Sequence, residues 1–446
     1  MLIGIYIRKK AITPQGFFLA DRSIIWPVLT ATITATVIGG SATIVAGGRI
    51  YALGLPGLWY DLGGAIGLLV LGIFLARTIR KTGLITLPDI IGSLYDQKVR
   101  YASAVLIIIT EIAWIALLIQ SSSIILSVIL SIDYMLILVI SSCIFIAYTL
   151  IGGQYAVIYT DIIQFFIMFI GICLLAAPLL FFEATPYFQT IPLSHIQFPV
   201  NENMGFLGVI SIFFMMFFPH VVGPDIYSKI LSAKDTRHAM IGTLCSGIFK
   251  FIFAIAIGII ALAAIVLPSI QQSITNPYLA IPVVVTLLPP ILAGFILAAF
   301  LSAMMSSADS CLLSAGTILS VDITKKNDVL TSQIGIFCVG IAALLLAIYH
   351  SMLGSILDTL QLAYTVFTAG LTLPVLFGFY KEKTKVTVKG ALWSLVLGGG
   401  SSLLFLQIQP YSPYAVLIGL LISSIPLLVL RHESETKRYH SDAKAR

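Results

Sequence analysis

The sequence carries little charge. Asp, Glu, Lys and Arg make up only 10% of its 446 residues, whereas hydrophobic residues make up 59%. Soluble domains contain roughly 25% charged residues, so no soluble surface could be built from this composition. The longest polar stretch is residues 183–204, and only a short tail follows Leu430. We therefore expect a single transmembrane domain over residues 1–446, without a second, soluble domain.

Patterns typical of several other protein classes are also missing. The five cysteines stand singly within apolar segments and show no CxxC spacing, so neither a disulfide nor a zinc site is expected. HExxH and GxSG-type patterns are absent, and His220, at a helix break, is the sole histidine placed to act as a base inside a span. The sequence therefore gives no reason to expect an enzyme.

Long apolar runs fill most of the chain. Runs of about 20 residues or more are long enough to cross a bilayer as helices. An all-α, polytopic membrane fold is therefore predicted. The expected helices cover residues 24–53, 57–79, 101–130, 134–151, 155–182, 205–230, 238–267, 290–320, 330–350, 353–380, 388–407 and 413–430.

Two of these spans are interrupted in matching places. Gly39-Gly40-Ser41 lies inside the first full span, and the segment 219–224, which begins and ends with proline, lies inside the sixth. Backbone polar groups freed at membrane depth are tolerated only beside protein or a polar cavity. Breaks in the first and sixth spans, which run in opposite directions, are typical of transporters built from inverted five-helix repeats with the ligand site between them.

The basic residues predict the orientation of the chain. If residues 1–23 are cytoplasmic, all but two of the 25 Lys and Arg residues lie on the cytoplasmic side, the exceptions being Arg49 and Lys250. The C-terminus is then cytoplasmic, and the net charge of +6 reflects topology and gives no reason to expect nucleic acid. Residues 1–7 are apolar but cover only about 10 Å of a roughly 30 Å core, so we interpret them as the end of an additional helix.

Polar residues at membrane depth are the candidates for function, because each must be paired or face water. Asp161 is the most informative of the acids, since a carboxylate at the bilayer centre costs at least about 2.5 kcal/mol without a partner. The candidates are Asp61, Glu111, Gln120, Asp161, Gln164, Lys250, the run 302–310, Asp358 and Gln361.

Several short motifs, in this order, resemble the sodium:solute symporter family. They are Phe17-Phe18-Leu19-Ala20-Asp21-Arg22-Ser23, Gly39-Gly40-Ser41, Leu150-Ile151-Gly152-Gly153, Tyr159-Thr160-Asp161-Ile162-Ile163-Gln164, Leu231-Ser232-Ala233-Lys234 and 303–310. The resemblance covers residues 1–430 and implies a leucine-transporter-like fold of five-plus-five inverted repeats with accessory helices. It implies a helix remnant and cytoplasmic loop (1–23), a first repeat (24–182), an inverted second repeat (205–380), accessory helices (388–430) and a cytoplasmic tail (431–446).

The adjacent hydroxyls of Ser306 and Ser307 suit Na⁺, a hard cation that prefers oxygen ligands. The resemblance implies a sodium site formed by these hydroxyls with the carbonyls of Ala35, Ile38 and Ala303. It also implies that Asp161, with Asp309 and Ser310, borders the exit path or a second sodium site. Small residues in this helix would equally permit close packing, and Asp161 could instead reach cytoplasmic water.

The resemblance also implies a substrate site. Lys250 matches a lysine that contacts the sugar in the bacterial sodium/galactose symporter, and Asp61 falls where that protein has a sugar-binding glutamate. Ser41, Gln120 and Gln361 are further candidate substrate contacts. The sugar pattern is otherwise broken, because other residues replace its glutamine, asparagine and tyrosine; these are Ala42, Met216 and Pro219. A structural ion pair between Asp61 and Lys250 remains an alternative.

The expected function is Na⁺-coupled symport of a small polar organic solute across the cell membrane by alternating access. Na⁺, the solute and the lipid bilayer are the expected partners, and no obligate protein partner is evident. Two alternatives stay open. A proton-coupled or Na⁺-independent carrier on the same fold would use Asp161 or Glu111 as a proton relay, and a transporter-like membrane sensor would need a signalling domain.

Overall fold

The computed structural model describes residues 13–130, 132–353 and 355–431. The predicted helix remnant 1–7 and most of the predicted tail 431–446 lie outside the described residues. Within the described part, helices dominate and the only extended pairings are isolated bridges. Ten helices there are long and apolar enough to cross a membrane, and a bent helix pair adds one more span.

The first span is broken where the sequence predicts. It consists of α3 (Trp26–Val37), a π-helical turn (Ser41–Val45) and α4 (Ala46–Leu53), with a bend of 64° between the two parts. The residue after α3, Ile38, has φ −100° and ψ 68°, which ends the helical hydrogen-bond pattern. A short helix, α2 (Pro14–Leu19), precedes the span.

The rest of the predicted first repeat follows the expected order of helices. The second span, Leu55–Thr82, contains α5 (Trp59–Val70) and α6 (Ala76–Thr82), and the third is α8 (Gln97–Leu130). The short helix α7 (Leu87–Leu94) links them. Helix α8 begins before the predicted residue 101 because the side chain of Asp96 accepts hydrogen bonds from the first-turn amides of Lys98 and Val99.

One long helical stretch replaces two predicted helices. Residues Tyr134–Thr190 include α9 (Tyr134–Met168) and α10 (Ala177–Ala184), and the helical geometry is interrupted at Gly153, with φ 55° and ψ −162°. A straight helix of this length would be about 85 Å long, far more than the roughly 30 Å hydrocarbon core. The stretch therefore contains two spans that meet at Gly153, as the predicted helices 134–151 and 155–182 imply.

The predicted second repeat begins with another broken span. Helix α12 (Phe206–Val222) and α13 (Pro224–Ser232) meet at Gly223, whose ψ of 129° is extended. Pro219 and His220 lie inside α12, so the break is narrower than the predicted 219–224. Between the repeats lies the short helix α11 (Leu193–Ile196).

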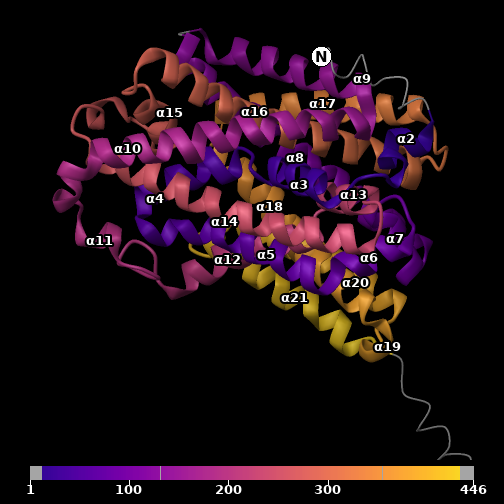
Figure 1. The fold of residues 1–446 in the computed structure, drawn as a ribbon. Helices are drawn as coiled ribbons and strands as arrows, with labels where there is room; N and C mark the ends of the chain where they lie inside the picture. Colours follow the sequence, from indigo (N-terminus) through magenta and orange to yellow (C-terminus); the bar gives the residue numbers. More distant parts are fainter. Residues whose placement is uncertain (1–12, 131, 354, 432–446) are drawn as a thin grey trace, which may run out of the picture.

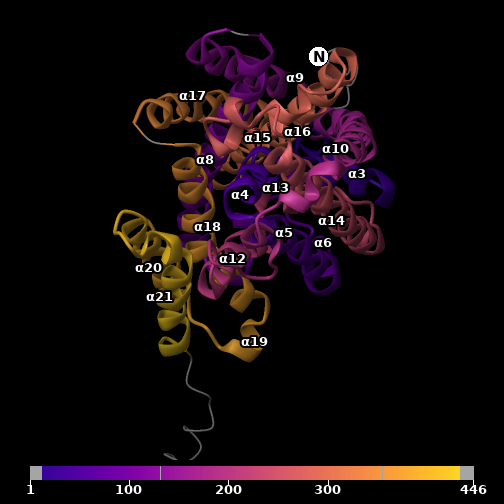
Figure 2. The ribbon, with the colours of Figure 1, turned by 90° about the vertical axis from the view of Figure 1, so that its left-hand side faces the viewer.

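The remaining helices cover the rest of the predicted second repeat and the predicted accessory part. They are α14 (Thr236–Val266), α15 (Ala280–Val285), α16 (Pro290–Ile318), α17 (Val329–Leu353), α18 (Ile356–Phe379), α19 (Lys381–Thr384), α20 (Val388–Leu406) and α21 (Ala415–Val429). Helices α20 and α21 pack on each other and on α18 at the edge of the bundle (Figure 2).

The start of α18 corrects one expectation. Asp358 was predicted to lie at membrane depth, but it is exposed and forms a capping box with Ser355. Its Oδ2 accepts a 2.6 Å hydrogen bond from the Ser355 amide. Asp358 therefore caps the N-terminus of α18 and does not place a carboxylate in the interior of the bundle.

Arginines cross-link one end of the bundle, where α2 and α7 lie; α11 and α15 lie at the opposite end (Figure 1). Arg22 donates to the carbonyls of Gly83 and Leu84. Arg100 forms ion pairs of 3.0 Å with Asp89 and 2.7 Å with Asp322. The side chains that the sequence analysis assigns to the cytoplasm therefore hold together loops from distant parts of the chain.

Candidate functional site

The end of α3 leaves backbone carbonyls without helical partners at the centre of the fold. Ser307 Oγ donates to the carbonyl of Thr36 at 2.6 Å, and Lys250 Nζ donates to that of Val37 at 3.2 Å. No hydrogen bond from beyond α3 reaches the carbonyls of Ala35 and Ile38 within the described chain. These two oxygens are therefore free to bind a ligand.

Helix α16 places Ser306 and Ser307 against this break. Both side chains are buried, and a Cβ on Gly39 would lie only 2.5 Å from Ser307 Oγ. Ser306 Oγ donates to Asp161 Oδ1 at 2.6 Å, whereas the Ser307 hydroxyl is committed to a backbone carbonyl. Each hydroxyl thus gives its single proton to an acceptor and keeps lone pairs for a cation.

Asp161 is the centre of a buried polar network. Lys229 Nζ lies 3.0 Å from Asp161 Oδ2, both side chains are fully buried, and the Thr32 hydroxyl donates to the same carboxylate. With Ser306, this network joins α3, α9, α13 and α16, which come from both predicted repeats. Asp161 is therefore paired within the protein.

Asp309 and Ser310 lie one turn further along α16. Thr149 Oγ1 donates to Asp309 Oδ1 at 2.9 Å, and Asp309 Oδ2 has no hydrogen-bond partner in the described part of the chain. Ser310 Oγ lies 3.0 Å from Thr36 Oγ1. The structure therefore brings Ser310 to the α3 break and turns Asp309 toward the α9 side of the helix.

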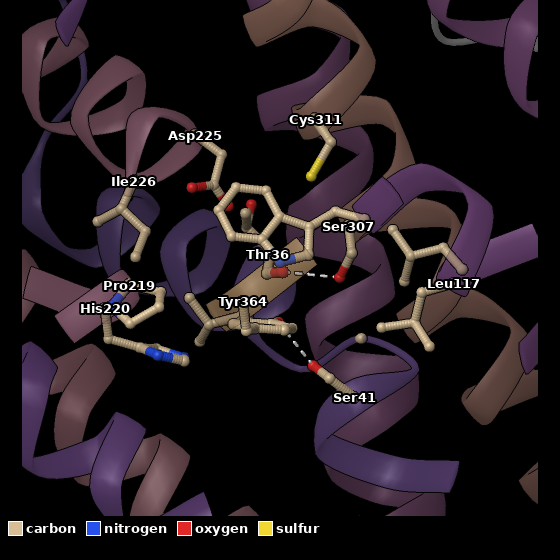
Figure 3. Close-up of a pocket in the computed structure, with 14 residues that line it drawn as sticks. Thr36, Ser41, Leu117, Pro219, His220, Asp225, Ile226, Ser307, Cys311 and Tyr364 are labelled. Carbon is tan, nitrogen blue, oxygen red and sulfur yellow. Dashed lines mark hydrogen bonds between the residues drawn. The ribbon is translucent and has the colours of Figure 1, made fainter. Parts of the chain in front are cut away.

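A small, partly open cavity lies between the two broken spans. Figure 3 shows Asp225, Cys311, His220, Ser41 and Tyr364 around this space, and Ser41 Oγ lies 3.0 Å from the Tyr364 hydroxyl. The other lining residues are Thr36, Val37, Gly39, Trp114, Leu117, Leu118, Pro219, Ile226 and Ser307. This central cavity therefore contacts the candidate sodium ligand Ser307 directly.

Asp61 and Lys250 form a buried ion pair beside the cavity. Lys250 Nζ lies 3.2 Å from Asp61 Oδ1, and neither side chain lines the central cavity. A Cβ on Gly64 would meet both Lys250 Cε at 2.5 Å and His220 Cε1 at 2.7 Å, so Lys250 and the cavity-lining His220 converge on the same face of α5. A substrate contact by the pair stays a prediction.

Two further predicted substrate residues lie elsewhere. Gln120 donates from Nε2 to the Ala347 carbonyl and the Ser351 hydroxyl, each at 3.4 Å, and lines a separate pocket. Gln361 lines outer pockets that it shares with residues of the 405–415 region. Of the predicted substrate residues, only Ser41 lines the central cavity.

Sequence reasoning missed Lys229 and Asp225. Lys229 stands near the end of a predicted span, where basic residues are expected on the cytoplasmic side. A helix rises 1.5 Å per residue, so Lys229 is only about 8 Å beyond the Pro224 break and still at membrane depth. Counting from the break would have identified both side chains.

Ten or more membrane-spanning helices, two of them broken around a central cavity, define a polytopic membrane protein with the architecture of an inverted-repeat transporter. The model of the sodium:solute symporter family matches residues 17–398. The chain therefore belongs to the sodium:solute symporter family.

Known transporters resemble this chain in sequence and in fold. The chain is 28% identical over 367 residues to the high-affinity choline transporter 1 of Caenorhabditis elegans, covering 75% of this chain and 62% of that protein. It is 26% identical over 450 residues to the sodium/glucose cotransporter 4 of Danio rerio, covering 89% and 68%. The outward-open structure of a Na⁺-coupled sialic acid symporter superposes with a TM-score of 0.81 at 17% identity, covering 96% and 94%. The leucine-transporter-like fold predicted from sequence is thereby confirmed.

Proposed function

We propose that the protein is a Na⁺-coupled symporter of a small organic solute in the cell membrane. The observation that carries the proposal is the pair of serine hydroxyls on α16, whose protons are both given to acceptors while their lone pairs face a helix break with two free carbonyls. Na⁺ is favoured by such an all-oxygen ligand set.

The proposed ion ligands are the carbonyls of Ala35, Ile38 and Ala303 with the two serine hydroxyls. The broken span that contains α3 belongs to the first repeat and α16 to the second, so a cation between them draws the repeats together. In this scheme Na⁺ stabilises one arrangement of the repeats and raises the affinity for solute in the adjoining cavity. Inward movement of one charge then gains about 2.3 kcal/mol per 100 mV of membrane potential.

The named relatives support a Na⁺-coupled carrier but differ in solute, since they include choline, glucose and sialic acid transporters. We propose a cytoplasmic location for the end of the bundle that carries Arg22, Arg80 and Arg100, because basic residues near span ends are retained inside. The C-terminus lies on the same side in this proposal.

The test is a thermal-shift screen of the purified protein against a metabolite library, run once in Na⁺ and once in K⁺. A substrate of a Na⁺-coupled carrier should raise the melting temperature mainly in Na⁺, because the ion and the solute bind cooperatively. Equal stabilisation by every hit in Na⁺ and in K⁺ would contradict Na⁺ coupling.

Proton coupling is the second candidate, and one observation favours it. Glu111 is fully buried in α8, and neither of its carboxyl oxygens has a hydrogen-bond partner in the described structure. Asp161 is engaged by Lys229, so Glu111 is the better placed proton carrier. Solute uptake that is driven by a pH gradient in the absence of Na⁺, and is lost in Glu111→Gln, would establish this alternative.

A further inference from the structure

The central cavity has an unbalanced charge. Of the 14 residues drawn around it in Figure 3, Asp225 is the only one with a carboxylate, and none is a lysine or an arginine. The two nearby lysines are already neutralised, Lys250 by Asp61 and Lys229 by Asp161. The cavity wall therefore carries one carboxylate and no lysine or arginine of its own.

Asp225 is held so that its carboxylate is available. It stands in the first turn of α13, directly after the extended Gly223, where the helix N-terminus favours negative charge. Its side chain is half-buried although it lies deep in the bundle, because it faces the cavity. No ion pair to Asp225 exists among the described residues.

Aromatic rings form another part of the wall. Trp114 and Tyr364 both line the cavity, with ring centroids 5.3 Å apart in an edge-to-face arrangement, and Phe367 lies behind Trp114 at 4.9 Å. Trp114 is only 6% exposed, and its indole N–H has no hydrogen-bond partner in the described structure. Faces of Trp and Tyr attract organic cations, most strongly where water is excluded.

Other groups near the cavity are compatible with a positively charged ligand. Glu111 is buried behind the wall, within electrostatic range of Asp225, and adds no positive charge to the site. His220 Nδ1 lies 2.7 Å from the Met216 carbonyl and donates to it, so a neutral imidazole offers only its acceptor, Nε2, to a ligand. The arginine Arg49 belongs to a separate outer pocket, 5.7 Å from the Tyr60 ring centroid.

We propose that the central cavity binds a small organic ammonium ion, with the Asp225 carboxylate as its counter-ion and the rings of Trp114 and Tyr364 as its aromatic wall. The proposal rests on the proposed carrier function, because it assigns the substrate class of that carrier. It excludes anionic solutes, for which the cavity offers no cation.

The experiment measures binding by calorimetry with the purified full-length chain in NaCl. The probes are choline, ethanolamine and tetramethylammonium, and the control is 3,3-dimethylbutan-1-ol, an uncharged compound in which carbon replaces the nitrogen of choline. At least one cation should bind, and choline should bind at least about tenfold more tightly than its neutral analogue if cation–π and charge contacts operate. Failure of all three cations to bind at millimolar concentration would overturn the proposal.

Two variants locate the site. Asp225→Asn keeps the side-chain shape, so the protein should stay folded while the preference for cation over neutral analogue falls by about tenfold or more. Glu183→Gln removes the same charge from an exposed position on α10 and should leave the preference unchanged. Unchanged cation binding by folded Asp225→Asn would overturn the assignment.

Repeating the titrations in KCl separates the two proposals. Cation binding that is equal in NaCl and KCl would support the substrate class and contradict Na⁺ coupling. Na⁺-dependent binding of a neutral or anionic solute, with no binding of the three cations, would support Na⁺ coupling and overturn the substrate class.

Discussion

The ammonium of Lys229 lies 3.0 Å from Asp161, and both side chains are completely buried where α13, α9 and α16 meet. The same carboxylate accepts the proton of Ser306, so the ion pair fixes the orientation of a proposed sodium ligand. The pair also connects the half of the sixth span beyond its break to the fifth span. Movement of one repeat against the other must therefore accommodate or break this contact.

Removing one partner of this pair should destabilise the protein strongly. Lys229→Met leaves the Asp161 carboxylate buried without a cation, which costs about 3–5 kcal/mol in other proteins. We expect a clear fall in the melting temperature, and recovery of most of it in the double variant Asp161→Asn with Lys229→Met. A single variant that melts like the unchanged protein would show that the contact contributes nothing to stability.

For the ion pair of Asp61 and Lys250, we expect a double variant to restore stability without restoring uptake. Asp61→Asn alone leaves a buried ammonium and should lower the melting temperature, whereas Asp61→Asn with Lys250→Gln should restore it. We expect the double variant to fold and yet lose uptake, because Lys250 also binds the Val37 carbonyl at the helix break. Uptake at normal affinity by the double variant would assign the pair to structure alone.

The close approach of Gly39 to Ser307 gives a third prediction. An added Cβ would lie 2.5 Å from Ser307 Oγ and 2.9 Å from the Leu118 side chain, so Gly39→Ala must displace the hydroxyl. We expect the Na⁺ concentration for half-maximal effect to rise by about tenfold, the loss of roughly 1.4 kcal/mol of binding. Gly294→Ala lies on α16, the helix that carries Ser307; its added Cβ would meet nothing within 4 Å, so it is the control. Equal Na⁺ affinity in both variants would contradict the site.

The proposed orientation is testable with cysteine labelling. Lys98 is exposed at the end that carries Arg100, and Glu183 is exposed in α10, toward the opposite end of the bundle. A membrane-impermeant maleimide should label Glu183→Cys in whole cells and label Lys98→Cys only after the cells are opened. The unchanged chain, with its own cysteines, gives the background. Labelling of Lys98→Cys in intact cells would invert the topology.

Sequence reasoning located the spans and both breaks because hydrocarbon imposes simple rules on backbone hydrogen bonds. Gly39-Gly40 and the Gly223-Pro224 junction interrupt helices for reasons visible in the residues themselves. Ser306 and Ser307 could be singled out because two adjacent hydroxyls at membrane depth are chemically unusual. The breaks therefore also predicted where the cavity would lie.

Partnerships across the bundle could not be predicted in the same way. Lys229 and Asp161 are far apart in sequence, and the charge rule that gave the orientation assigned Lys229 to the membrane surface. Asp358 shows the reverse error, since a residue predicted at depth caps the start of a helix. Depth depends on where a helix begins relative to its neighbours, which local sequence does not encode.

Binding of radioactive ²²Na⁺ to the purified protein tests the central claim most directly. The account predicts saturable Na⁺ binding that is lost in Ser306→Ala with Ser307→Ala and is retained in Ser302→Ala, whose hydroxyl bonds within its own helix α16. All three proteins should be shown to be folded by their melting curves. Unaltered Na⁺ binding by the folded double variant would contradict the proposed sodium site.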